Sequence, residues 1–206
     1  MVDAEAADYA TPFKHMTLTP LVTFKNADTN NSNEQDGIAS NGKMIAVNWA
    51  SSASIAVFNA EKPLNFDARV PLLKGHSGAI FDMQWNPFED RLLATCADDG
   101  KVKLWVFDDY EGLTSTGHRN DPDMELEAHA RKCASVQWHE AAENLLFTHG
   151  ADKTLKIWDI NEDRCDDPIF TFTNMPDMVT SARWSPSGNR IGGALKNKHM
   201  LIVDPR

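Results

Sequence analysis

The chain has 206 residues, of which 42% are hydrophobic and 24% charged, as in an ordinary globular protein that buries a core. Its formal net charge of −10 excludes a general nucleic-acid binder, which needs a surplus of Lys and Arg to displace phosphate counterions, and argues against docking to anionic membranes. Three widely spaced cysteines, Cys96, Cys133 and Cys165, do not make the pattern of a disulfide framework and indicate reduced thiols in a cytoplasmic protein.

The chain begins with an acidic tail, residues 1–15, that lacks the basic-then-apolar pattern of a signal peptide. No apolar run approaches the ~20 residues of a membrane helix. Residues 43–49 and 54–58 predict two short strands. Because no stretch has a sustained 3.6-residue apolar period, the predicted class is all-β. Further strands, rich in β-branched or aromatic residues and bounded by turn formers, are predicted at Ala79–Trp85, Leu92–Cys96 and Val102–Val106.

The chain contains an internal repeat, which two pairs of tryptophans reveal. The members of each pair are 20 residues apart, a histidine lies nine residues before each pair, and the second set is shifted by 53 residues. These residues are His76, Trp85 and Trp105 in the first copy, and His129, Trp138 and Trp158 in the second. A third copy begins at Trp184 and has Met175 and Asn197 where the others have histidine and aspartate.

The repeat resembles the WD repeat of β-propellers, in which a histidine, a Ser/Thr, a turn aspartate and a tryptophan hydrogen-bond together. Such a set satisfies a buried indole N–H and hydroxyl. A catalytic role is disfavoured, because the same set recurs once per repeat. The residues predicted to form these structural networks are His76, Thr95, Asp99 and Trp105, then His129, Thr148, Asp152 and Trp158.

The expected fold is about three complete blades and a partial fourth of a seven-bladed propeller. The blades are predicted at approximately 16–74, 75–128, 129–173 and 174–206. The rest of the ring is expected from the remainder of a longer chain or from a partner.

The 53-residue spacing exceeds the ~40–45 residues of a WD repeat, and the excess predicts an inserted loop at 107–124. This loop is either a solvated connection or a recognition loop for a basic partner, since long loops on rigid scaffolds commonly carry binding. Its acidic candidate residues are Asp108, Asp109, Asp121, Asp123 and Glu125.

No metal or cofactor is expected. Four residues have metal-capable side chains, but their spacing matches no common zinc pattern. They are His129, Cys133, His139 and His149.

From Lys43 to Arg206 the chain resembles the coronins. The long tandem-propeller type is similar at the Pro-Phe-Glu-Asp turn and at the segment Met44 to Asn48. The segments that carry the family resemblance are Leu73 to Asp90, Leu92 to Thr95, Val136 to His139, and the ending Val203-Asp204-Pro205-Arg206.

The resemblance implies a non-catalytic, cytoskeleton-associated protein that binds actin filaments or the actin-nucleating Arp2/3 complex. Coronin contact with actin depends on basic residues near the N-terminus, whereas Lys14 and Lys25 are the only Lys or Arg before Lys43 here. The alternative is a divergent WD-repeat scaffold subunit of another multiprotein assembly, without actin binding.

Overall fold

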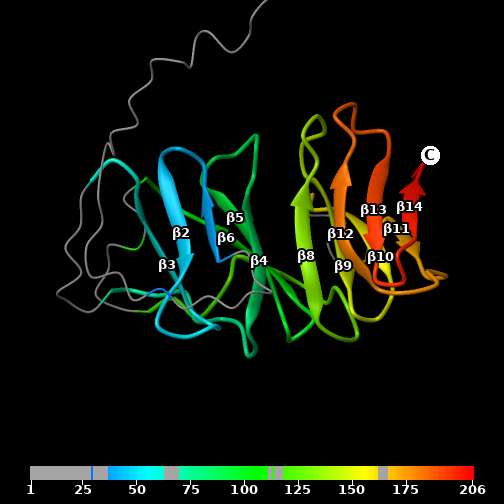
Figure 1. Cartoon of the computed structure of the whole chain (residues 1–206). Helices are drawn as coiled ribbons and strands as arrows, with labels where there is room; N and C mark the ends of the chain where they lie inside the picture. Colours follow the sequence, from blue (N-terminus) through cyan, green and yellow to red (C-terminus); the bar gives the residue numbers. More distant parts are fainter. Residues whose placement is uncertain (1–28, 30–36, 63–69, 111–112, 114–117, 162–166) are drawn as a thin grey trace, which may run out of the picture.

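The computed structural model describes residues 29, 37–62, 70–110, 113, 118–161 and 167–206. These residues form 14 strands in four antiparallel sheets, and they include no helix (Figure 1). None of them, therefore, belongs to a helix long and apolar enough to cross a membrane.

Each sheet is a meander in which consecutive strands pair. The first consists of β1 (Ile38–Ser40), β2 (Met44–Asn48) and β3 (Ile55–Asn59). The second consists of β4 (Ile80–Trp85), β5 (Leu92–Ala97), β6 (Val102–Val106) and β7 (Met124–Leu126). The third consists of β8 (Cys133–Trp138), β9 (Leu145–Gly150), β10 (Leu155–Asp159) and β11 (Phe170–Phe172). The fourth consists of β12 (Val179–Trp184), β13 (Ile191–Leu195) and β14 (Met200–Val203).

The four sheets stand side by side like the blades of a propeller (Figure 1). Their first strands are neighbours in chain order: β1 lies against β4, β4 against β8, and β8 against β12. In the first sheet an outer strand is reduced to a single bridge, where Leu73 pairs with Ile55 of β3. No outer strand follows β14 in the described residues, which end at Arg206.

The core lies between successive sheets. One cluster joins the first sheet to the second, another the second to the third, and another the third to the fourth. Since β5 is covered on both sides, all six of its residues are buried. By contrast, Met200 and Ile202 on β14 are 88% and 74% exposed, so one face of the last sheet has no cover.

The predicted insertion is anchored to the first sheet. It connects β6 to β7 over residues 107–123, of which 111–112 and 114–117 lie outside the described part. Near its start, the Tyr110 carbonyl accepts a hydrogen bond from Asn59 Nδ2 at 3.0 Å. Near its end, the Arg119 backbone N–H donates to the Leu72 carbonyl at 2.9 Å, and its carbonyl accepts from the Lys74 N–H at 2.9 Å. The insertion thus ties the outer edges of the first two sheets together.

The turn between β5 and β6 requires a glycine. Gly100 has φ +78°, and a Cβ there would lie 2.3 Å from the His129 carbonyl oxygen and 2.8 Å from that of Arg131. Gly42 has φ +86°, but a Cβ there would meet nothing within 4 Å. The two positions therefore share the backbone strain of a left-handed residue and differ in steric room.

We expect Gly100→Ala to lower the free energy of unfolding by at least about 3 kcal/mol, because backbone strain and overlap with a neighbouring blade add. Gly42→Ala, with strain alone, should cost about 1 kcal/mol. Urea denaturation of both variants measures the difference. Equal losses would contradict the close approach between the second and third sheets.

Candidate functional site

The second sheet contains an unbroken chain of hydrogen bonds. Trp105 Nε1 on β6 donates to Thr95 Oγ1 on β5 at 3.0 Å. Thr95 Oγ1 lies 2.9 Å from His76 Nε2, and His76 Nδ1 lies 2.9 Å from Asp99 Oδ2 in the β5–β6 turn. With the ring proton on Nδ1, the hydroxyl donates to Nε2 and every donor has an acceptor. Thr95 and Trp105 are fully buried, so these bonds satisfy groups that water cannot reach.

The third sheet repeats this arrangement. Trp158 Nε1 donates to Thr148 Oγ1 at 3.0 Å, and Thr148 Oγ1 lies 2.9 Å from His129 Nε2. His129 Nδ1 lies 3.0 Å from Asp152 Oδ1 and 2.9 Å from the hydroxyl of Thr154. All eight residues predicted for the two networks are thus brought together in two sets of four.

The carboxylate at the end of each chain is held in its ionised form. Burial alone would raise the pKa of Asp99, but the hydrogen bond from His76 and those from the backbone of Lys101 and Ser77 outweigh it and hold the pKa at about 2. The pKa of Asp152 is also lowered: burial opposes the shift, and hydrogen bonds from Thr154 and His129 prevail.

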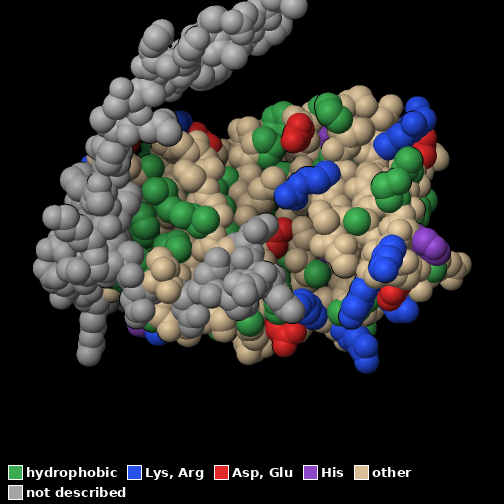
Figure 2. Space-filling model, in the orientation of Figure 1, with side chains coloured by type: hydrophobic (Ala, Val, Ile, Leu, Met, Phe, Trp, Pro, Cys, Tyr) green, Lys and Arg blue, Asp and Glu red, His purple; other side chains and the backbone are tan. Residues whose placement is uncertain are grey.

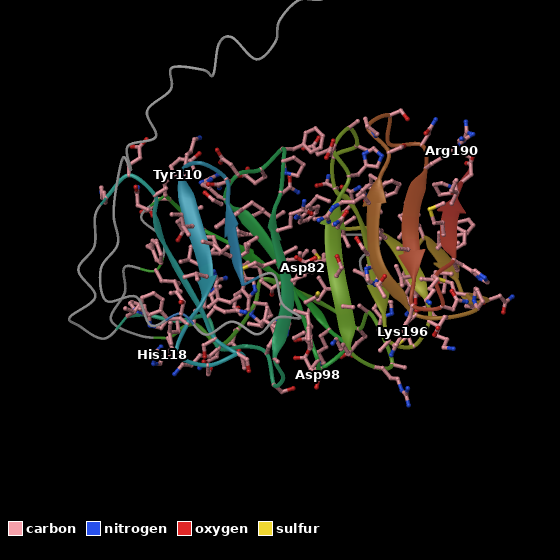
Figure 3. The ribbon with its side chains drawn as sticks, viewed as in Figure 1. Asp82, Asp98, Tyr110, His118, Arg190 and Lys196 are labelled. Atoms are coloured by element: carbon pink, nitrogen blue, oxygen red, sulfur yellow. The ribbon has the colours of Figure 1, made fainter. Side chains whose placement is uncertain are left out.

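Polar side chains also join the second sheet to the third. Asp82 on β4 lies between β4 and β8 (Figure 3), and its Oδ2 accepts from Ser135 Oγ at 2.6 Å and from the Val136 N–H at 3.1 Å. Gln84 Oε1 accepts from the Trp138 N–H at 2.7 Å, and its backbone carbonyl accepts from Trp138 Nε1 at 3.0 Å. Four hydrogen bonds therefore lock these first strands together.

The boundary between the third and fourth sheets is different, because a cavity of about 620 Å³ lies there. Residues from β8, β9 and β12, from the connections beside them, from β4 and from the turn after β13 line it. Three of them are the cations Lys132, Arg183 and Lys196, and a fourth is the buried His149. The repeat analysis did not predict this cavity.

One signal for the cavity was present in the sequence. Aligned on the tryptophans, Arg183 takes the position of Gln84 and Gln137, and Lys132 takes that of Ala79. Cations that replace neutral residues in a structural repeat are candidates for binding, since the repeat itself does not require them.

The acidic candidate loop is partly neutralised by its own neighbours. Asp123 Oδ2 accepts from Arg119 Nη2 at 2.5 Å and from the Val106 N–H at 2.6 Å. Glu125 lies on β7 rather than in the loop, where it pairs with Lys101 at 2.6 Å and with Lys103. The remaining three candidates, all exposed, are Asp108, Asp109 and Asp121.

The four metal-capable residues are not brought together as a metal site. In the described part of the chain, no group of three or more His, Cys, Asp or Glu side chains is placed to hold a metal ion. His139 Nε2 instead lies 3.0 Å from the Gly188 carbonyl oxygen, and Cys96 and Cys133 are buried free thiols. Cys165 and the N-terminal tail, with Lys14 and Lys25, lie outside the described residues.

Comparisons with known proteins agree with this geometry. The family profile described as "WD domain, G-beta repeat" matches residues 68–106 and 120–159, which hold the second and third sheets except β11. In structure, the chain is similar to the WD40 domain of a Toxoplasma gondii coronin, with a TM-score of 0.75 and 25% identity over 87% of this chain and 45% of that one. These matches and the four sheets define a WD-repeat β-propeller fragment, which confirms the predicted fold class.

The sequence relatives specify the family. The chain is 32% identical over 186 residues to a coronin-like protein of Saccharomyces cerevisiae, covering 86% of this chain and 28% of that protein. It is 28% identical over 190 residues to human Coronin-7, covering 90% of this chain and 20% of that protein. The chain belongs to the coronin family, as the sequence predicted. It spans less than a third of the length of these curated relatives, and the tandem-propeller type stays a prediction.

We expect Asp99→Ala to lower the free energy of unfolding by about 1–3 kcal/mol, because it leaves the buried His76 N–H without its acceptor. Asp98→Ala is the matched control, since Asp98 is the exposed neighbour in the same turn (Figure 3). Thermal denaturation of both variants measures the effect. If the Asp99→Ala variant has the same melting temperature as the wild type, the network does not contribute to the stability of the blade.

The lowered pKa of Asp99 also predicts an acid dependence. A carboxyl whose pKa falls from 3.8 to about 2 on folding stabilises the folded state above pH 3.8 and loses that contribution as the pH falls toward 2. We expect Asp99→Asn to lose less stability than the wild type between about pH 5 and pH 2. Melting temperatures across this range test it, and parallel curves would contradict the assignment.

Proposed function

We propose that the chain is a non-catalytic protein-interaction platform that binds actin filaments or actin-regulatory complexes in the organisation of the cytoskeleton. The observation that carries the proposal is the match to coronins over 86–90% of the chain. The hydrogen-bonded blades supply a rigid scaffold, and rigid scaffolds present binding loops with little loss of conformational entropy.

The distribution of charge supports an acidic partner such as actin, although the whole chain carries −10. Residues 174–206 contain five Lys or Arg and only two Asp. Figure 2 shows Lys and Arg side chains gathered at the lower right, at the end of the third and fourth sheets that holds the β9–β10 and β13–β14 turns. Segregated charge of this kind steers association with a partner of opposite sign. The basic turn residues are Lys153, Lys196 and Lys198.

The acidic loop suggests a second contact. Asp108 and Asp121 are exposed, and the described ends of the insertion are bonded to the first sheet and its outer edge. Within a regulatory assembly, a preorganised acidic loop suits a basic partner. The alternative overall function is a WD-repeat scaffold subunit of another assembly that does not bind actin.

We expect the chain to co-sediment with actin filaments at low salt, and less at physiological salt, because exposed charges are screened. Lys153→Glu combined with Lys198→Glu should lower the pelleted fraction several-fold at low salt. The matched control is Asp108→Lys combined with Asp121→Lys, which reverses two charges of the opposite sign in the loop and should leave pelleting intact.

Absence of pelleting at both salt concentrations would favour the scaffold alternative. If the Asp108→Lys and Asp121→Lys variant fails to pellet while the lysine variant pellets like the wild type, the actin contact lies in the acidic loop and not in the basic turns.

A further inference from the structure

The boundary between the third and fourth sheets lacks the hydrogen bonds found at the boundary before it. Asp82 and Gln84 of β4 bond to β8, whereas the equivalent residues of β8 are Ser135 and Gln137. Gln137 Nε2 is buried without a hydrogen-bond partner, and so is Trp184 Nε1, although the equivalent Trp138 Nε1 has one. Two buried nitrogen atoms at this boundary are therefore unsatisfied.

His149 is the most unusual of these groups. It is 1% exposed, it lines the 620 Å³ cavity, and neither of its ring nitrogens has a hydrogen-bond partner. Leaving both nitrogens unpaired is costly in a folded protein. Burial lowers the pKa of His149 to about 4, with the charges of His129 and Arg183 acting in the same direction, so the ring at neutral pH is an uncharged donor and acceptor. A polar ligand in the cavity would satisfy it.

The repeat itself does not explain this histidine. In the strand pairing, His149 lies opposite Ser135 just as Cys96 lies opposite Asp82 in the second sheet and Ala194 opposite Ser181 in the fourth. A small side chain therefore suffices at this position in the two neighbouring blades.

The cavity concentrates positive charge in a strongly acidic chain. Among the described residues its lining includes Lys132, Arg183 and Lys196, together with Asp82, which accepts hydrogen bonds from β8. The Lys132 ammonium is held 3.5 Å from the centre of the Phe81 ring, at the cavity wall. An anionic ligand suits a lining that carries Arg183 and Lys196 beside the unpaired nitrogens of His149.

We propose that the cavity between the third and fourth sheets binds a phosphate group. Arg183 offers a planar, bidentate donor set, which suits tetrahedral oxyanions. Lys132 and Lys196 add charge from either wall, His149 adds one N–H donor, and Ser135 adds a hydroxyl. The volume lies within the range of small-ligand sites. This proposal does not depend on actin binding.

Residues at equivalent positions of the other sheets show which substitutions the fold accommodates. One backbone hydrogen bond closes the same end of each sheet, from Asp98 to Ala79, from Ala151 to Lys132 and from Lys196 to Met178. Lys196 is therefore equivalent to Ala151. Templated variants that remove the site are Arg183→Gln, Lys196→Ala and His149→Cys.

The test is isothermal titration calorimetry on the full chain at constant ionic strength in a phosphate-free buffer. One arm uses inorganic pyrophosphate, and another uses a short neutral peptide with a single phosphoserine. We expect saturable binding in at least one arm, and about tenfold weaker binding in Arg183→Gln and in Lys196→Ala. Tighter binding of pyrophosphate identifies a soluble phosphate compound as the source, and tighter binding of the peptide identifies a phosphorylated side chain.

Arg190→Gln is the matched control, since it removes the same charge from the same sheet outside the cavity lining (Figure 3). It should bind like the wild type. Thermal melts verify folding, and Lys196→Ala, at an exposed turn position, carries the test if Arg183→Gln does not fold. No binding in either arm, equal weakening by Arg190→Gln, or equal binding of a peptide with glutamate in place of phosphoserine would overturn the proposal.

Discussion

The structure depends on a chain of hydrogen bonds in the second and third sheets, which runs from the third strand to the second, then to a histidine that precedes the first strand, and ends at an aspartate in a turn. In the second sheet it runs from Trp105 through Thr95 and His76 to Asp99. A buried indole N–H or hydroxyl without a partner costs about 1–3 kcal/mol of stability. The carboxylate fixes the ring tautomer, so one ionised group at the turn sets the direction of every bond behind it.

This chain of bonds explains why blades of one fold can differ at their boundaries. Because the networks of the second and third sheets satisfy their own indole, hydroxyl and imidazole groups, the side chains between these sheets are not needed for that purpose. Asp82 and Gln84 are therefore available to bond the second sheet to the third. At the next boundary, His149 and Arg183 line a cavity instead.

The strands and the two networks could be predicted from the sequence because both are local or periodic. Val102–Val106 was predicted to the residue, and the His76–Asp99 pairing followed from an offset that recurred 53 residues later. The cavity could not be predicted, since it depends on how far two sheets approach, which no spacing within a repeat encodes. Glu125 was assigned to the loop because β7 is only three residues long, and the lysines that hold it lie on a different part of the chain.

The insertion between β6 and β7 has a mechanical consequence. Its bonds at Arg119 fasten the rims of the first two sheets, and Asp82 fastens the inner strands of the second and third. Among the described residues, the polar contacts across the boundary beyond β8 lie in the connections, where His139 Nε2 is 3.0 Å from the Gly188 carbonyl oxygen and Lys153 is 3.7 Å from Asp177. We therefore expect a force that spreads the blades to open the boundary beside His149 before it separates the first three sheets.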